Sequence, residues 1–164
     1  MLNLSECQQC EDVSLIEPFV IKTDYFLQSE YNIEVQSINV KQLQNSVAIG
    51  NINFLTTLSG AVNTNLIFSF EKPLAKTILD TIPFIEYDDE NFEELLFEVV
   101  SEFLNLIVGR AMKDIQTDER LRFSPPIEIL GDSKMFCNSD FNICKIDFIT
   151  SKGNMTMIFS TQIQ

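Results

Sequence analysis

The chain has 164 residues, of which 45% are hydrophobic, and this suits a single globular domain over 1–164 with a sizeable core. Its net charge is −13 and it has no histidine, so it lacks the basic patch that binds nucleic acid and is unsuited to an anionic membrane surface. The lack of histidine also excludes Ser-His-Asp and Cys-His nucleophiles and histidine-based metal hydrolases. Paired-carboxylate chemistry stays open, although nothing in the sequence singles out such a pair.

The first twelve residues, MLNLSECQQCED, lack the basic start and apolar core of a signal peptide, and no apolar run approaches the ~18 residues of a membrane span. We therefore expect a cytoplasmic protein with residues 1–12 as a disordered tail. Cys7 and Cys10 form a C-x-x-C that could hold zinc together with Cys137 and Cys144, but the second spacing is too wide for a zinc knuckle. We expect reduced cysteines and no metal site.

The N-terminal half is predicted to form a helix followed by strands. The helix covers 14–31, with Pro18 in its first turn, where proline is tolerated. Three strands are expected at 33–40, 47–58 and 61–70. Gly50 can mark a bulge in the second strand, and alternating apolar and polar residues in the third indicate a half-buried strand.

A short helix is predicted over 73–81, followed after an acidic run by the longest element, a helix over 91–114. Asp88, Asp89 and Asn91 supply cap-type side chains before it, and Lys113 lies in its last turn, where a cation is favoured. At about 100° per residue, its apolar residues form one wide arc that is expected to pack on a sheet. They are Phe92, Leu95, Leu96, Val99, Val100, Phe103, Leu104, Leu106, Ile107 and Ala111.

The remaining arc of this helix is a polar ridge that includes Glu98, Ser101, Glu102, Asn105 and Gly109. Glu102 and Asn105 are three residues apart and are therefore neighbours on the ridge. Asn is a poor helix-interior residue, and Gly in a helix costs about 1 kcal/mol of stability relative to Ala. The presence of both on the exposed face of this helix is consistent with a surface that binds a partner. The alternative is an ordinary solvated helix face.

The C-terminal part is predicted to be mostly strand. In SPPIEILG the two prolines exclude helix, and 127–130 can enter the sheet at an edge. Segments 144–150 and 155–162 form a hairpin across Ser151-Lys152-Gly153-Asn154. The order of elements predicts an α+β fold in which two long helices pack on one face of an antiparallel sheet of about six strands, in two structurally similar halves.

The segment SEFLNLIVGRA, followed by SPPIEILG, resembles the CheX branch of the CheC/CheX/FliY chemotaxis phosphatases. In that family a helix carries a Glu-x-x-Asn pair followed by an apolar stretch, a glycine and a small residue, and then a proline-containing strand entry with a glycine. EPFV, from Glu17 to Val20, is similar to the family's early Asn-Pro-Phe segment, with Glu17 in place of Asn. The resemblance extends from Glu17 to the last strand.

This resemblance implies a phosphatase that dephosphorylates a CheY-type response-regulator receiver, whose aspartyl phosphate lies beside a receiver-bound Mg²⁺. Glu102 matches the motif Glu, which would dock on the receiver's active-site lysine, and Asn105 matches the motif Asn, which would position the attacking water. The chain itself would bind no cofactor. The first helix offers only Glu30-Tyr31-Asn32, with the wrong spacing for a second pair, so one site per chain is expected. The resemblance also implies a homodimer formed through the sheets.

Helix geometry alone adds Glu98, Ser101 and Gly109 as candidate contacts with the partner. Because receiver active sites are acidic, gross electrostatics would not attract a partner of charge −13, and local complementarity would have to suffice. The alternative is a non-catalytic receiver-binding or flagellar-switch module of the same fold. A third hypothesis, a small-ligand domain that uses the sheet face, would require a well-formed apolar pocket away from the long helix.

Overall fold

The structure is a computed structural model that describes residues 13–43, 46–50, 52–83, 85–130, 133–136 and 140–162. The expectations for the N-terminal tail, for Cys7 and Cys10 and for Cys137 lie outside these residues. None of the helices in the described ranges has the length and hydrophobicity needed to cross a membrane.

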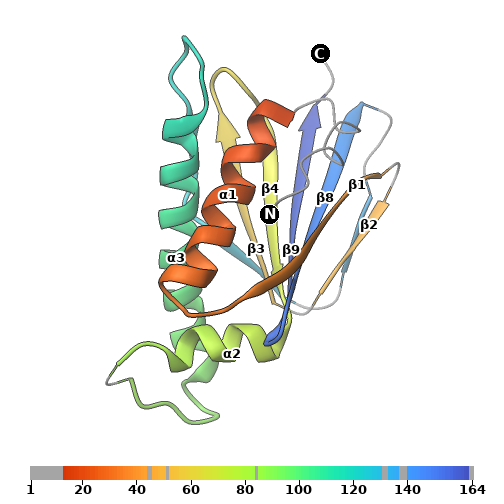
Figure 1. Cartoon of the computed structure of the whole chain (residues 1–164). Coiled ribbons are helices and arrows are strands. Elements are labelled where there is room, and N and C mark those ends of the chain that lie inside the picture. The colour runs from red at the N-terminus through yellow and green to blue at the C-terminus, as the bar shows by residue number, and fades with distance from the viewer. Residues whose placement is uncertain are drawn as a thin grey trace.

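Within the described residues, three helices cover one face of an antiparallel sheet (Figure 1), which confirms the predicted α+β fold. They are α1 (Val13–Ser29), α2 (Lys72–Asp80) and α3 (Phe92–Asp114). The strands are β1 (Val35–Leu43), β2 (Ser46–Ile49), β3 (Ile52–Ser59), β4 (Thr64–Phe70), β5 (Arg122–Phe123), β6 (Ile127–Leu130), β7 (Ser133–Phe136), β8 (Phe141–Thr150) and β9 (Gly153–Gln162). In Figure 1, α1 and α3 run along the sheet and α2 crosses one end of it.

The main sheet has the strand order β1-β8-β9-β4-β3-β5, and β6 also pairs with β3. It therefore has seven strands in the described residues, against the predicted number of about six, because two short strands share the outer edge of β3. The strands from both halves of the chain mix in this order, with β8 and β9 placed between β1 and β4.

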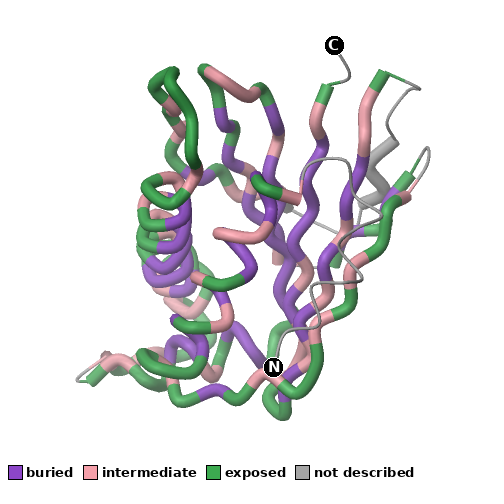
Figure 2. The backbone as a smooth tube through the Cα atoms, turned by 45° about the horizontal axis from the view of Figure 1, so that its top comes forward, coloured by how far each residue is buried: buried purple, intermediate pink, exposed green. Residues whose placement is uncertain are grey.

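The register of the sheet builds the core beneath the helices. Phe54 lies opposite Phe68, Phe68 opposite Met157, and Met157 opposite Ile146, so these side chains form one row across four strands. All four have no exposed surface. In Figure 2 the buried residues, in purple, lie along the central strands of the sheet and on parts of the helices packed against it.

A small second sheet, made of β2 and β7, packs on the opposite face of the main sheet. Val47 and Ile49 of β2 cover Ile67, Ile143 and Ile158, which are buried as a second apolar cluster. In the alternation predicted for the third strand, over 61–70, Ile67 shares alternate positions with Asn63, Asn65 and Ser69, on the side expected to be polar. Ile67 is buried because β2 covers the face that this alternation left open.

The predicted strand over 47–58 is wrong, because the structure divides it into β2 and β3, which belong to different sheets. Gly50 lies at this break rather than in a bulge within one strand. Its N–H donates to Ser69 Oγ at 2.9 Å, and a Cβ placed on Gly50 would lie 3.0 Å from the same oxygen. The close approach to β4 therefore favours glycine at this position.

The two long helices pack against each other in antiparallel directions. Lys22 Nζ of α1 forms an ion pair with Asp114 of α3 at 2.5 Å, while the Phe26 ring meets the Phe103 ring edge to face at 6.4 Å. Because α1 begins at Val13, Pro18 lies beyond the first turn, in contrast to the prediction. The pairing of these helices decides which α1 residues flank the exposed face of α3.

Candidate functional site

The candidate site lies on α3, and the turn before this helix is held by its own side chains. Asp88 Oδ1 accepts hydrogen bonds from the N–H groups of Glu90 and Asn91 at 3.0 and 3.1 Å. Asn91 Oδ1 accepts one from Asp88 N–H at 2.9 Å. Asn91 occupies the N-cap position but makes no side-chain bond to the helix. These side chains therefore stabilise the turn that leads into α3 rather than capping its free N–H groups.

One side of α3 is buried on the sheet and on α1, as its apolar spacing predicts. The buried residues are Leu96, Val99, Val100, Phe103, Leu104, Ile107, Val108 and Ala111. The prediction for Leu106 is wrong, since this side chain is 37% exposed while Val108 is buried. Leu106 follows Glu102 by one turn and shares its outward direction.

The opposite side of α3 carries an exposed stripe, which we call the α3 stripe and define as Glu98, Glu102, Asn105, Leu106 and Gly109. Glu98, Glu102 and Leu106 are exposed, and Asn105 and Gly109 are half-buried. Glu102 and Asn105 are the predicted catalytic pair. Neither side chain has a hydrogen bond or an ion pair within the described residues. Their polar groups are thus available to another molecule.

Gly109 has no packing role among the residues that the structure describes. A Cβ placed there would meet no atom within 4 Å, apart from the helix's own nearby backbone. Since glycine within a helix costs about 1 kcal/mol relative to alanine, the fold alone gives no reason for it. A shallow depression of about 330 Å³ begins beside it and is also lined by Met112 and Lys113. A second surface can therefore approach the backbone of α3 at this point.

Ser101 is oriented differently from the rest of the predicted contacts. Its Oγ is buried and has no hydrogen-bond partner among the described residues. The hydroxyl therefore does not point outward with Glu102 and Asn105. A partner would meet the other, partly exposed atoms of Ser101, and the expectation that Ser101 is a contact position stays a prediction.

Tyr31, just beyond the end of α1, flanks the α3 stripe, which the sequence did not reveal. Its ring meets the Phe103 ring edge to face, with the centroids 5.3 Å apart. Burial raises the pKa of the Tyr31 hydroxyl above its ordinary value of 10.0, and the negative charges of Glu30 and Glu102 raise it further. In the sequence, Glu30-Tyr31-Asn32 was notable only because Glu30 and Asn32 have the wrong spacing for a second Glu-x-x-Asn pair. The position of Tyr31 near Glu102 follows from the packing of α1 on α3.

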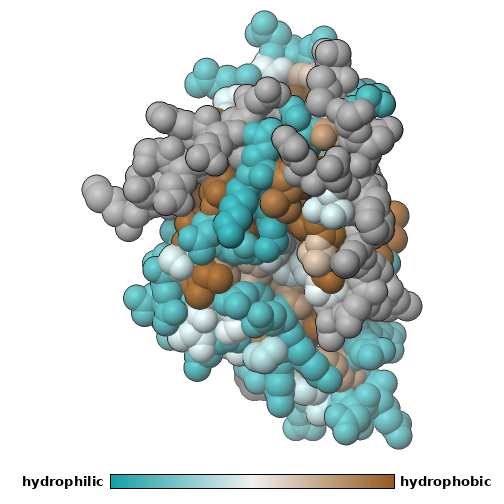
Figure 3. All heavy atoms as spheres, turned by 90° about the vertical axis from the view of Figure 1, so that its right-hand side faces the viewer, coloured by the Kyte–Doolittle hydropathy of each residue, from teal (hydrophilic) through white to brown (hydrophobic). Residues whose placement is uncertain are grey.

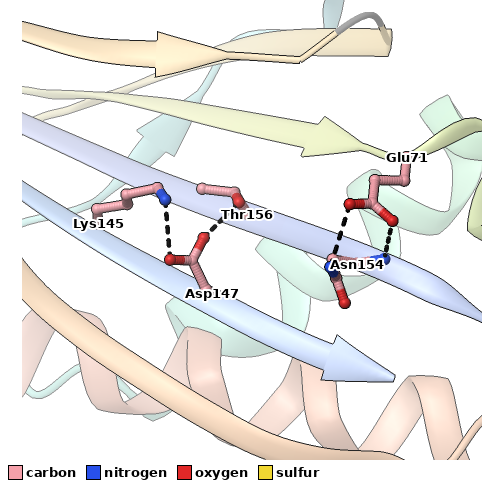
Figure 4. Close-up of polar contacts among 5 residues, drawn as sticks. All are labelled: Glu71, Lys145, Asp147, Asn154 and Thr156. Atoms are coloured by element: carbon pink, nitrogen blue, oxygen red, sulfur yellow. Dashed lines mark hydrogen bonds and ion pairs between the residues drawn. The ribbon is translucent and has the colours of Figure 1, made fainter. Parts of the chain in front are cut away.

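The other face of the sheet carries a separate set of polar side chains (Figure 4). Lys145 Nζ contacts Asp147 Oδ2 at 2.8 Å, and Thr156 Oγ1 donates to Asp147 Oδ1 at 2.6 Å. Asn154 donates from its backbone and side-chain nitrogens to the two carboxylate oxygens of Glu71 at 2.9 and 3.1 Å. These groups satisfy one another, so we assign them a structural role.

The sheet face also bears on the third hypothesis, a small-ligand domain. A depression of about 340 Å³ on this side has Ser69, Glu71, Lys72, Asn154 and Thr156 among its lining residues. It is therefore not the apolar pocket that this hypothesis requires. Seen from the side of β1 and β2, hydrophobic and hydrophilic surfaces alternate (Figure 3).

Among the described residues, no group of three or more His, Cys, Asp or Glu residues could hold a metal ion.

The sequence of the chain matches a known protein family. The profile of a family described as chemotaxis phosphatase CheX matches residues 52–148, which are more than half of the chain and include the α3 stripe. Comparison with curated protein sequences gave no match.

Several solved structures share the fold. A chemotaxis protein CheX from Desulfovibrio desulfuricans is 20% identical, with a TM-score of 0.74, over 90% of this chain and 99% of that chain. A chain of a CheX-CheY-BeF₃-Mg²⁺ complex from Borrelia burgdorferi is 20% identical, with a TM-score of 0.69, over 90% and 97%. The FliM middle domain from H. pylori is 10% identical, with a TM-score of 0.50, over 93% of both chains. At these identities the structures establish the fold alone.

Proposed function

The chain belongs to the chemotaxis phosphatase CheX family, and from this premise we propose that it hydrolyses the aspartyl phosphate of a CheY-type response-regulator receiver. One observation carries the proposal: Glu102 and Asn105 lie one turn apart on the exposed side of α3, and neither has an intrachain partner in the described residues. A CheX chain has been solved in complex with CheY from Borrelia burgdorferi, which supports a receiver as the partner.

The exposed position of the pair suits an enzyme whose active site is completed by its substrate. The α3 stripe is a convex helix surface, and Asn105 can enter the receiver's site only if the two proteins dock. The receiver would supply the phosphorylated aspartate and the Mg²⁺ beside it. This chain would supply no cofactor of its own.

In the proposed reaction Asn105 positions the attacking water. Hydrolysis of an acyl phosphate passes through a loose transition state, in which placement of an in-line water matters more than covalent chemistry by the enzyme. The Asn105 carbonyl oxygen would accept a hydrogen bond from the water, while its NH₂ group donates to a phosphoryl oxygen. The water oxygen then bonds to phosphorus as the bond from phosphorus to the aspartate oxygen breaks. The aspartate is left as a carboxylate, and the two water protons leave with the released phosphate.

Glu102 has a docking role in this proposal. Its carboxylate would pair with the receiver's active-site lysine and thereby fix the orientation in which Asn105 enters. It need not act as a general base. A carboxylate aimed at a phosphoryl group would repel it, so pairing with a cation is what allows Glu102 to lie so close to the reaction.

Other residues of the α3 stripe would complete the contact. Gly109 would allow close approach of the receiver, and Glu98 would make a peripheral contact. We further propose a cytoplasmic homodimer. The dimer surface would lie on the side of the main sheet opposite the helices, where β2 and β7 already cover part of the main sheet.

The alternative is a non-catalytic module that binds a receiver, or acts in a flagellar switch, through the same stripe. The test is to mix the protein with a Mg²⁺-loaded, phosphorylated CheY-type receiver from the same organism and follow the loss of phosphate. An enzyme accelerates this loss above the receiver's own decay. A pure binder forms the complex and leaves the decay unchanged.

A further inference from the structure

Arg110 lies beyond the C-terminal end of the α3 stripe and is held in a fixed orientation by α1. Its guanidinium lies over the Phe26 ring, 4.7 Å from the centroid. The Phe26 ring is itself held edge to face by Phe103 at 6.4 Å and by Tyr25 at 5.9 Å. A guanidinium stacked on an aromatic ring keeps its plane fixed and its edge N–H groups free to donate.

Arg110 has no anionic partner within the described residues. Asp114 lies one turn further along α3 and would be its ordinary helical partner. Asp114 instead forms its ion pair with Lys22 of α1, at 2.5 Å. Because α1 occupies Asp114, the guanidinium of Arg110 is left exposed and unpaired on a chain whose net charge is −13.

Along this side of α3 the unpaired charges of the described residues change sign, from acidic in the middle of the helix to basic near its C-terminal end. Glu98 and Glu102 are exposed in the middle of the helix, and Arg110 and Lys113 are exposed near its C-terminal end. An acidic surface would be repelled by the two glutamates and attracted toward the C-terminal end of α3. Arg110 is the cation held there in a fixed orientation, whereas the flexible Lys113 adds only a weak, unoriented attraction. A partner with carboxylates around its site can therefore bind here in only one orientation without placing like charges against each other.

We propose that Arg110 is a docking residue that pairs with a surface carboxylate of the receiver, next to the phosphorylated site rather than in it. This inference rests on the proposed function, because the proposed function is what identifies the receiver as the partner. Arg110 follows Asn105 by five residues, a rise of about 7.5 Å along the helix. Its side chain is turned toward Phe26. It therefore sets orientation and affinity, and takes no part in the reaction at the phosphorus.

Binding to a receiver loaded with BeF₃⁻ and Mg²⁺ tests the inference without any turnover. Arg110→Met removes the cation but keeps a flexible hydrocarbon side chain over Phe26. Lys113→Met is the matched control, because Lys113 is exposed and has no ring or ion-pair contact in the described residues. Loss of a charge-assisted hydrogen bond should raise the Kd about tenfold for Arg110→Met, whereas Lys113→Met should stay within about twofold. Arg110→Lys, which keeps the charge but not the planar fork, should lie between them.

The turnover of the same variants separates this inference from the proposed activity. At saturating phosphorylated receiver, Arg110→Met should reach the wild-type rate, and only the concentration needed should rise. If wild type accelerates phosphate loss while Arg110→Met and Arg110→Lys both bind as wild type does, the inference on Arg110 is overturned and the activity stands. If wild type binds without acceleration and Arg110→Met weakens binding, the activity fails and the docking role stands. A wild type that does not bind the receiver overturns both.

Discussion

The Tyr31 ring meets the Phe103 ring edge to face, with the ring centroids 5.3 Å apart. Because Glu102 directly precedes Phe103, this contact holds the segment after α1 beside Glu102. The α3 stripe is therefore bordered by a phenol on one side. The same antiparallel packing places Phe26 under Arg110 further along the helix pair. Helix pairing thus determines the surroundings of the stripe as much as the α3 sequence does.

The titration of Tyr31 should report its distance from Glu102. Burial first, and then the charges of Glu30 and Glu102, keep the pKa of Tyr31 above 10.0. Glu102→Gln removes one of these charges and should lower the Tyr31 pKa. The phenolate absorbance lost on Tyr31→Phe identifies the signal, and an unchanged Tyr31 titration in Glu102→Gln would show that the two groups are not close.

The same shift predicts how stability depends on pH. Above pH 10.0 the unfolded chain ionises Tyr31, whereas the folded chain keeps it protonated to a higher pH. The contribution of the protonated Tyr31 to the free energy of unfolding is therefore intact below pH 10.0 and is lost as the pH rises above it. Denaturant titrations across this range should show a smaller alkaline loss for Tyr31→Phe than for wild type. Equal losses would contradict the assignment.

Gly109→Ala should separate stability from docking. Because a Cβ at this position meets nothing inside the chain, the free energy of unfolding should rise by about 1 kcal/mol, the usual gain of alanine over glycine in a helix. Against a closely docked receiver, the added methyl group should weaken binding at least about fivefold, since overpacking costs about 1–3 kcal/mol. Denaturant unfolding and receiver binding measure the two effects.

Gly153→Ala is the contrasting control for this experiment. Gly153 has a φ of +111°, and a Cβ there would lie 3.0 Å from the backbone nitrogen of Leu74. This substitution should destabilise the fold by about 1–2 kcal/mol or more. If Gly109→Ala were also destabilising, α3 would be packed more tightly at that point than the structure shows.

Ser101→Ala should leave function intact. Its buried Oγ has no partner in the described residues, so removing it should leave the free energy of unfolding unchanged or raise it by about 1 kcal/mol. Receiver dephosphorylation should keep its wild-type rate. A lower affinity for the receiver in this variant would mean that the hydroxyl turns outward when the two proteins dock.

Glu102→Gln and Glu98→Gln remove the same charge at positions one turn apart. If Glu102 pairs with the receiver's lysine, its replacement should raise the Kd about tenfold, whereas the peripheral Glu98 should change it by about twofold or less. Binding of the BeF₃⁻-loaded receiver measures both. Equal effects of the two variants would indicate a general charge effect in place of a specific ion pair.

Local sequence patterns predicted the long helix and its polar pair well. The structure has α3 at Phe92–Asp114, within one residue of the prediction, because its turn-forming side chains and apolar spacing all lie within the segment. Glu102 and Asn105 share its exposed side for the same reason. Spacing within one helix is sufficient to predict both.

Features that depend on contacts between distant segments were not predictable in this way. The division of 47–58 into two sheets depends on Ser69 approaching Gly50 and on the pairing of β2 with β7. The exposure of Leu106 depends on how far α1 and the sheet extend around α3. The positions of Tyr31 and Arg110 beside the stripe required knowledge of the antiparallel α1–α3 packing.

The central claim is that Asn105 performs the chemistry, and one pair of measurements on Asn105→Ala tests it most directly. With a Mg²⁺-loaded phosphorylated receiver, this variant should lose about 100-fold or more of the rate acceleration, the usual effect of removing a positioned hydrogen-bonding group. Its Kd for the BeF₃⁻-loaded receiver should stay close to that of wild type, because Glu102 and the rest of the stripe still dock. Acceleration by Asn105→Ala equal to that of wild type would contradict the claim.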